Sequence, residues 1–162
     1  MKSALAIIAG VVILVAMPVA AVAAEDEQGT PVRLTPSSSS VTSGSVTAAA
    51  ASPAGCYGQT DYAHYSPSYT AAVHGRTTCY ATVQEAYVNT TLQRDRWWGW
   101  QSVASQSKTR TYYRYTPDAA PHWYCKGTNT STYRGISNHR SKEAGKYYYA
   151  YTKSSSNRSF YC

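Results

Sequence analysis

Residues 79–88, Cys-Tyr-Ala-Thr-Val-Gln-Glu-Ala-Tyr-Val, decide the fold class because small or apolar residues occupy every second position from Cys79 to Val83. A period of two is typical of a half-buried β-strand, in which successive side chains point to opposite faces of the sheet. The pattern places Cys79, Ala81 and Val83 on one face. The stretch therefore predicts a strand.

The rest of residues 56–162 repeats these β signals. Every Tyr, every Trp and the only Phe of the chain fall in this segment, together with a single leucine, Leu92. Such a composition, rich also in Thr, Ser and Val, favours strands over helices. Turn residues separate further strands predicted at residues 109–116, 122–126, 132–139, 146–152 and 159–162. Strands at this spacing predict an all-β fold, a small antiparallel β-sandwich or barrel.

The four cysteines of the chain predict disulfides that staple this domain. They are Cys56, Cys79, Cys125 and Cys162. An even number in a small exported domain is typical of a disulfide framework, and pairing neighbours in sequence closes two local loops. The other two pairings stay open. A four-thiolate metal site is the alternative, but the chain has no C-x-x-C pair to form one. We therefore expect no metal and no cofactor.

The N-terminal residues 1–24 predict a signal peptide. Lys2 precedes an apolar run over residues 4–16, and small residues fill positions 20–24, with cleavage expected after Ala23 or Ala24. The alternative is an uncleaved membrane anchor. The apolar run is short for a bilayer core, which needs about 20 apolar residues. We expect a secreted, extracellular protein with no membrane span after cleavage.

Residues 25–55 are expected to form a flexible tail ahead of the domain at 56–162. The tail holds three acidic residues and one basic residue, while the domain holds 13 basic and five acidic residues. Residues 35–54 carry no charge and no aromatic side chain, which is typical of a linker. Residues 30–34 could add an extended strand to a partner's sheet; the alternative is that they are disordered like the rest. This docking peptide comprises Thr30, Pro31, Val32, Arg33 and Leu34.

Aromatic and basic side chains supply the candidate binding residues of the domain. Trp97, Trp98 and Trp100 cannot all face inward on one strand, and indole rings stack on sugars or anchor protein interfaces. The basic strand predicted at residues 109–116 carries Arg110, Tyr112 and Arg114 on one face. Alternatively, the rings form the core and the basic residues are merely solvated. The positive charge favours anionic partners such as a cell-wall polymer, and nucleic acid is unexpected outside the cell.

No catalytic motif is present in the sequence. The four histidines are scattered, no G-x-S-x-G or H-E-x-x-H occurs, and the cysteines are assigned to disulfides. We therefore predict no catalytic residue and no enzyme. The alternative is a small secreted toxin or ribonuclease that uses Glu85 with a histidine and an arginine for general acid–base cleavage.

Five short motifs carry a resemblance to known proteins. They are Arg-Asp-Arg-Trp-Trp-Gly-Trp-Gln (94–101), Trp-Tyr-Cys-Lys-Gly-Thr (123–128), Tyr-Arg-Gly-Ile-Ser (133–137), Tyr-Ala-Tyr-Thr (149–152) and Ser-Phe-Tyr-Cys (159–162). The second half of the chain resembles small secreted four-cysteine β-domain proteins of filamentous actinobacteria. Its plan is similar to the adaptor subunits of umbrella toxin particles, in which an exported β-domain with an N-terminal extension links other secreted subunits of an antibacterial assembly.

This resemblance implies a non-enzymatic adaptor whose residues 30–34 dock on a partner protein. The basic domain would then form a second contact face. A cell-wall or carbohydrate-binding module is the alternative function, and the secreted toxin or ribonuclease is a third.

Overall fold

The computed structural model describes residues 28–36, 51–67, 69–116, 118–125 and 129–162, and these residues contain no helix. The predicted signal peptide at 1–24 and most of the predicted linker, residues 37–50, lie outside them. The described strands are β1 (Val32–Arg33), β2 (Tyr57–Thr60), β3 (His64–Ser66), β4 (Thr70–Ala72), β5 (Gly75–Arg96), β6 (Gly99–Tyr115), β7 (His122–Tyr124), β8 (Thr130–Glu143), β9 (Lys146–Lys153) and β10 (Arg158–Tyr161). The predicted all-β fold is confirmed.

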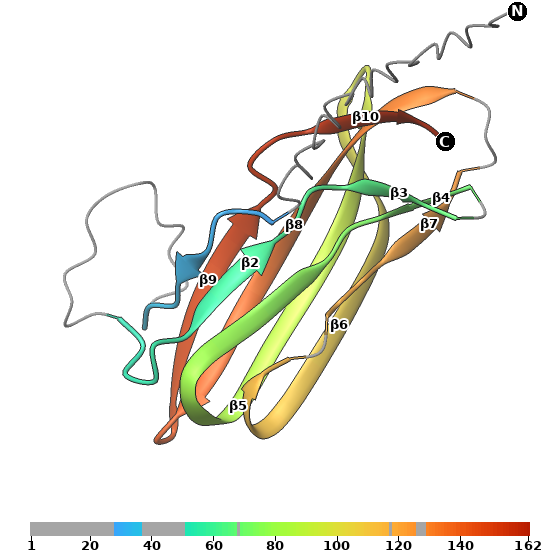
Figure 1. Ribbon diagram of the computed structural model, residues 1–162. Helices are drawn as coiled ribbons and strands as arrows, with labels where there is room; N and C mark the ends of the chain where they lie inside the picture. Colours follow the sequence, from blue (N-terminus) through green and yellow to red (C-terminus); the bar gives the residue numbers. More distant parts are fainter. Residues whose placement is uncertain (1–27, 37–50, 68, 117, 126–128) are drawn as a thin grey trace, which may run out of the picture.

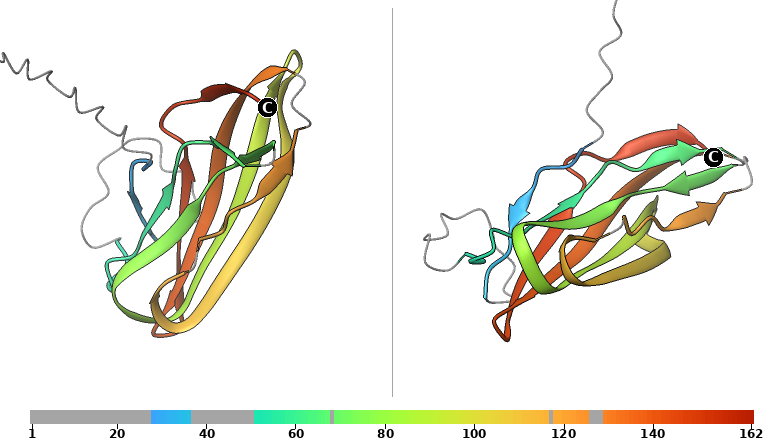
Figure 2. Two further views of the ribbon diagram at one scale, coloured as in Figure 1. Left: turned by 45° about the vertical axis from the view of Figure 1, so that its right-hand side comes forward. Right: turned by 60° about the horizontal axis from the view of Figure 1, so that its bottom comes forward.

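The strands form two antiparallel sheets. The larger follows the order β1-β2-β5-β8-β10, with β6 paired to β5 and β9 paired to β8, and the smaller follows β3-β4-β7. A backbone bridge between Thr35 and Tyr149 connects the β1 side to β9, with N–O distances of 2.9 and 2.7 Å. This bridge nearly closes the larger sheet into a barrel, visible in Figures 1 and 2.

Strand β5 belongs to two parts of the barrel because it bends sharply (Figure 1). Its first residues, 75–78, pair with β2, while residues 85–94 lie between β6 and β8. The β6 register shifts between Thr78 and Val83. Ala81 is exposed, so the predicted shared face of Cys79, Ala81 and Val83 is wrong at Ala81. A bulge that bends a strand also interrupts its period-two alternation.

Two buried apolar clusters and a polar layer fill the interior. One cluster contains Val73, Leu92, Tyr133 and the Cys125–Cys162 disulfide, and the other contains Leu34, Val83, Tyr148 and the Cys56–Cys79 disulfide. The polar layer lies between the two clusters and includes Ser137 and His139 of β8, which are both fully buried. The two disulfides join cysteines that are neighbours in sequence, so the preferred pairing is confirmed.

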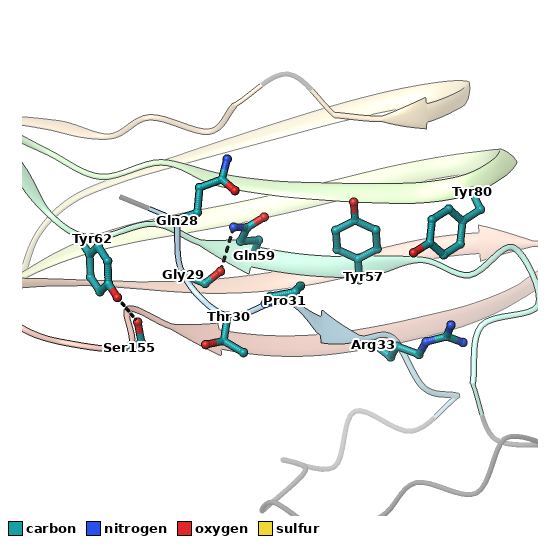
Figure 3. A pocket seen from close by; sticks show the side chains of 10 residues that line it. All are labelled: Gln28, Gly29, Thr30, Pro31, Arg33, Tyr57, Gln59, Tyr62, Tyr80 and Ser155. Carbon is teal, nitrogen blue, oxygen red and sulfur yellow. Dashed lines mark hydrogen bonds between the residues drawn. The ribbon is translucent and has the colours of Figure 1, made fainter. Parts of the chain in front are cut away.

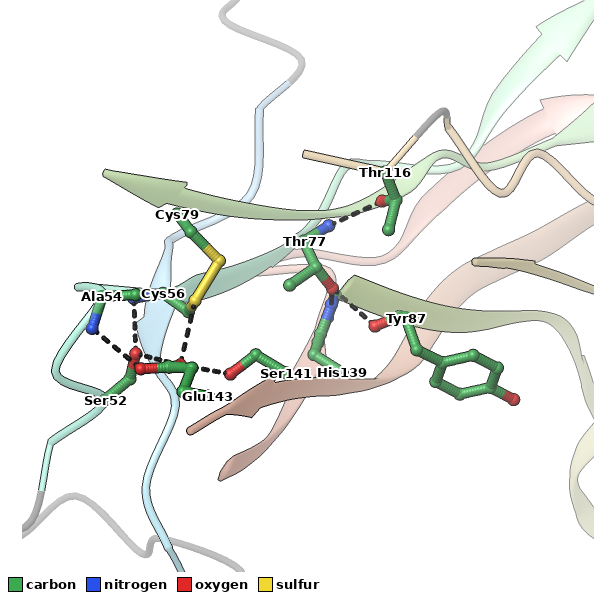
Figure 4. Close-up of a disulfide and its surroundings, with 10 residues drawn as sticks. All are labelled: Ser52, Ala54, Cys56, Thr77, Cys79, Tyr87, Thr116, His139, Ser141 and Glu143. Carbon is green, nitrogen blue, oxygen red and sulfur yellow. Dashed lines mark hydrogen bonds between the residues drawn. A yellow bond between two sulfur atoms is a disulfide. The ribbon is translucent and has the colours of Figure 1, made fainter. Parts of the chain in front are cut away.

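The boundary of the packed domain differs from the one predicted at residue 56. Residues 28–36 and 51–55 also pack on the barrel, and the side chain of Leu34 is completely buried in the second apolar cluster. The buried Glu143 holds the second of these segments by accepting hydrogen bonds from the Ser52 hydroxyl and the Ala54 amide (Figure 4). A leucine side chain and a few backbone hydrogen bonds thus fix segments whose composition alone predicts disorder.

Candidate functional site

The N-terminal segment forms one wall of an open groove on the barrel surface. Strand β1 pairs with β2 in a register that places Val32 opposite Gly58 and Arg33 opposite Tyr57. Ahead of β1, the Gln59 side-chain amide donates a 2.8 Å hydrogen bond to the carbonyl of Gly29. These contacts hold residues 28–33 in an extended conformation beside β2.

The groove has a volume of about 600 Å³ and a mixed aromatic and polar lining. Figure 3 shows Arg33 at the same end as Tyr57 and Tyr80, and Tyr62 with Ser155 at the other end. The lining residues are Gln28, Gly29, Thr30, Pro31, Arg33, Tyr57, Gln59, Tyr62, Tyr80 and Ser155. Three of the ten are tyrosines from different parts of the chain.

The tyrosine rings of the groove are held at both of its ends. Tyr57 and Tyr80 lie with ring centroids 6.0 Å apart, and Tyr80 is 72% exposed. At the other end the Tyr62 hydroxyl accepts a 2.7 Å hydrogen bond from Ser155, and the Arg158 guanidinium lies 4.6 Å from the Tyr62 ring centre. The groove therefore presents aromatic faces beside amide and hydroxyl groups.

A charged cluster begins at Asp61, beside Gly29 of the groove lining. Asp61 is paired with the Arg76 guanidinium, and Asp118 lies 3.7 Å from Arg76 Nε and 3.2 Å from His74 Nδ1. Burial raises the pKa of Asp61, although the positive charge of Arg76 opposes the shift. Both carboxylates face the same arginine, so the cluster connects the loops that precede β3, β5 and β7.

The predicted docking peptide is divided between the groove and the core. Thr30, Pro31 and Arg33 line the groove, whereas Val32 is half-buried in β1 and Leu34 is fully buried. The prediction was a strand added to a partner's sheet, whereas in the structure the segment adds a strand to the sheet of its own chain. Sequence cannot distinguish these cases because both require the same extended apolar peptide.

The three predicted tryptophans lie at the turn that joins β5 to β6. Trp97 and Trp98 form the turn and are 91% and 61% exposed. Trp100 is half-buried, and the Arg134 guanidinium lies 4.1 Å from its ring centre. Trp97 and Trp98 are thus free to contact a partner, while Trp100 is already covered by an arginine.

The predicted basic face of Arg110, Tyr112 and Arg114 is interrupted. Tyr112 has a φ of 53°, a left-handed conformation that breaks the alternation of the strand. Arg110 lies over the ring of Tyr113, 5.5 Å from its centre, and not beside Tyr112. Arg114 and Tyr112 instead line a smaller pocket of about 330 Å³, together with Thr82, Tyr113 and Tyr115.

Sequence reasoning missed Tyr57, Tyr62, Tyr80 and Gln59, which lie apart in the sequence and meet only in the folded groove. It also missed a row of tyrosines along β9, at positions 147, 149 and 151. Arg140 lies 5.3 Å from the ring centre of Tyr147. The period-two spacing of that row is a signal that could have identified it.

No protein-family model, curated protein or solved structure matches the chain. Among the described residues, no three His, Cys, Asp or Glu side chains gather in a way that could hold a metal ion. The same residues include no helix of the length and apolar character that crossing a membrane requires.

Proposed function

We propose that the protein is a secreted, non-enzymatic binding module that holds a glycan in the groove between its N-terminal segment and β2. The observation that carries this proposal is the lining, in which Tyr57, Tyr62 and Tyr80 share about 600 Å³ with the side chains of Gln28 and Gln59. Its two disulfides support an extracellular location, where thiols oxidise.

A glycan fits this lining for chemical reasons. The C–H faces of a sugar ring pack on aromatic rings, and its hydroxyl groups need donors and acceptors at the rim of the same site. The amides of Gln28 and Gln59 supply both. Arg33 adds a guanidinium at one end, which can bind a carboxylate in two parallel hydrogen bonds. The preferred ligand is therefore a glycan with acidic substituents, such as an anionic cell-wall polymer.

Calorimetric titration with two hexasaccharides tests the proposal, one of galacturonic acid and one of N-acetylglucosamine. We expect binding of the acidic oligomer, a loss of at least tenfold in affinity in Tyr80→Ala, and a smaller loss in Arg33→Gln. Tyr124→Ala is the matched control, because Tyr124 is 59% exposed on β7 and does not line the groove. No binding of either oligomer, or equal binding by Tyr80→Ala and wild type, would overturn the proposal.

An adaptor that binds a partner protein is the second candidate function, favoured by the long edge of β6. This strand has 17 residues and hydrogen bonds to β5 along one side. Within the described part of the chain no strand pairs with its other side. An exposed edge can accept a partner's strand, and Lys108, Arg110 and Arg114 favour an acidic one. The resemblance to adaptor subunits of toxin particles supports the same function.

A pull-down from culture medium tests the adaptor function. Deleting residues 28–36 is unsuitable because it removes Leu34 from the core. The informative variant is Lys108→Glu with Arg110→Glu, since both side chains lie on β6 and contribute little to the core. We expect it to lose partners that the wild type and Arg33→Gln both recover. Recovery of the same proteins by all three would contradict strand addition at β6.

A further inference from the structure

We propose that the β5–β6 hairpin turn binds anionic lipid bilayers by inserting Trp97 and Trp98 into the membrane interface. This activity goes beyond glycan binding, and it uses a different part of the molecule. The two rings lie edge to face, with centroids 5.2 Å apart. They form a single aromatic tip at the end of the hairpin.

The two indole rings of the tip are highly exposed to solvent. Trp97 keeps 91% of its surface accessible and Trp98 keeps 61%. Figures 1 and 2 show the hairpin turn projecting at the end of the barrel opposite the β8–β9 turn. Leaving two adjacent indoles in water is unfavourable, and paired exposed aromatics of this kind mark a contact surface.

The shape of the tip favours a bilayer as its partner. A glycan or peptide site is usually concave or flat, so that several groups contact one ligand. This tip is convex. A projecting indole can instead enter the headgroup region, where its ring is partly in the apolar layer and its N–H stays hydrated. Trp97 and Trp98 have the side-chain type and the position for this contact.

The charges behind the tip fit lipid phosphates. Arg96 is the last residue of β5, and its guanidinium lies 5.9 Å from the Trp98 ring centre. Arg94 lies two residues before Arg96 on β5. Its guanidinium donates a hydrogen bond to the Ser131 hydroxyl and lies 5.3 Å from the Trp123 ring centre. Asp95 is the one carboxylate on this stretch of β5, so the tip region keeps a positive charge. Arginine side chains near a surface strengthen binding to anionic lipids.

The hairpin holds this arrangement without a partner. Arg96 pairs with Gly99 and Asp95 with Trp100, which leaves Trp97 and Trp98 as a two-residue turn. Gly99 has a φ of 117°, a conformation that glycine adopts readily and other residues rarely adopt. Arg134 covers Trp100 from β8. Insertion therefore requires no unfolding of the barrel.

Fluorescence with lipid vesicles tests the inference on the full chain. The probes are vesicles of phosphatidylcholine alone and of phosphatidylcholine with an equal part of phosphatidylglycerol, each with and without brominated acyl chains. We expect a blue shift and bromine quenching with the anionic vesicles, and weaker effects with the neutral ones. Arg96→Gln should reduce binding to the anionic vesicles several-fold.

Vesicle sedimentation of two double variants distinguishes insertion of the tip from nonspecific adsorption through any exposed aromatic rings. Trp97→Ala with Trp98→Ala should lower partitioning into anionic vesicles at least tenfold. Tyr147→Ala with Tyr151→Ala is the matched control, since it also removes two exposed aromatic rings, from β9. The control should sediment like the wild type. Absence of binding by the wild type, or equal loss in both double variants, would overturn the inference.

Discussion

Glu143 accepts a 2.7 Å hydrogen bond from the hydroxyl of Ser52, which lies 91 residues earlier in the chain. The same carboxylate accepts a 2.8 Å bond from the Ala54 amide and a 2.6 Å bond from the Ser141 hydroxyl. Its side chain is almost completely buried. A charged acceptor with three donors therefore fixes the segment that leads into Cys56.

Glu143→Gln should lower the free energy of unfolding by about 1–3 kcal/mol, because the amide has one acceptor atom where the carboxylate has two and leaves a buried donor unpaired. Urea denaturation measures the loss, and hydrogen exchange should show faster exchange at Ala54. Glu85→Gln is the control. Glu85 binds Arg140 at the half-exposed surface, so its loss should be below about 1 kcal/mol. Equal losses in the two variants would contradict the anchoring role of Glu143.

Removing either disulfide should lower the free energy of unfolding by about 3–4 kcal/mol. The bridges close loops with sequence separations of 23 and 37 residues, and a crosslink of that span restricts the unfolded chain by an amount of this size. The double serine variants at Cys56 and Cys79, and at Cys125 and Cys162, test this by urea denaturation. A loss below about 1 kcal/mol in either would show that the bridge contributes little.

The sequence was sufficient to predict the all-β fold and most strands from Cys79 onward, since alternation and turn residues are local patterns. It favoured the disulfide pairing that the structure shows but left the other two pairings open. Period-two alternation marks a strand, and Ala144 and Gly145, both with positive φ, occupy a predicted turn. The alternation failed at Ala81 and at Tyr112. At both places the backbone leaves regular strand geometry, and no residue type in the neighbouring sequence predicts this irregularity.

The groove could not be predicted because its members meet only through strand pairing. Tyr57 and Tyr80 are 23 residues apart, and they approach because β2 pairs with the first residues of β5. The N-terminal peptide was predicted to add a strand to a partner's sheet, and in the structure it pairs with β2 of its own chain. Which sheet it joins depends on the pocket that receives Leu34, a property of the folded barrel.

Gly58→Ala should lower the free energy of unfolding by about 1–3 kcal/mol, the usual range for an overfilled core. A Cβ at this position would overlap the ring of His139, and the ring cannot move because both its nitrogens are hydrogen-bonded. The same substitution in a His139→Ser background should be nearly neutral. Thermal denaturation of the four proteins gives the coupling. A loss that is the same in both backgrounds would place the clash elsewhere.

His139 should make the protein less stable in acid. Its ring is buried, with Nδ1 3.0 Å from the Thr77 hydroxyl and Nε2 2.7 Å from the Thr152 hydroxyl. Burial lowers the pKa of His139 from 6.5 to about 3. Between these values the unfolded chain binds a proton that the folded protein excludes, so the free energy of unfolding falls as the pH falls.

The variant His139→Gln tests this, because its amide can replace one ring bond and does not titrate in this range. Stability measured by urea denaturation at several pH values gives the difference between wild type and variant. That difference should be largest above pH 6.5 and should shrink by about 2 kcal/mol between pH 8 and pH 5. The other three histidines are common to both proteins, so their contributions cancel. A difference that stays constant over this range would mean that the ring takes up a proton equally readily in the folded and unfolded states.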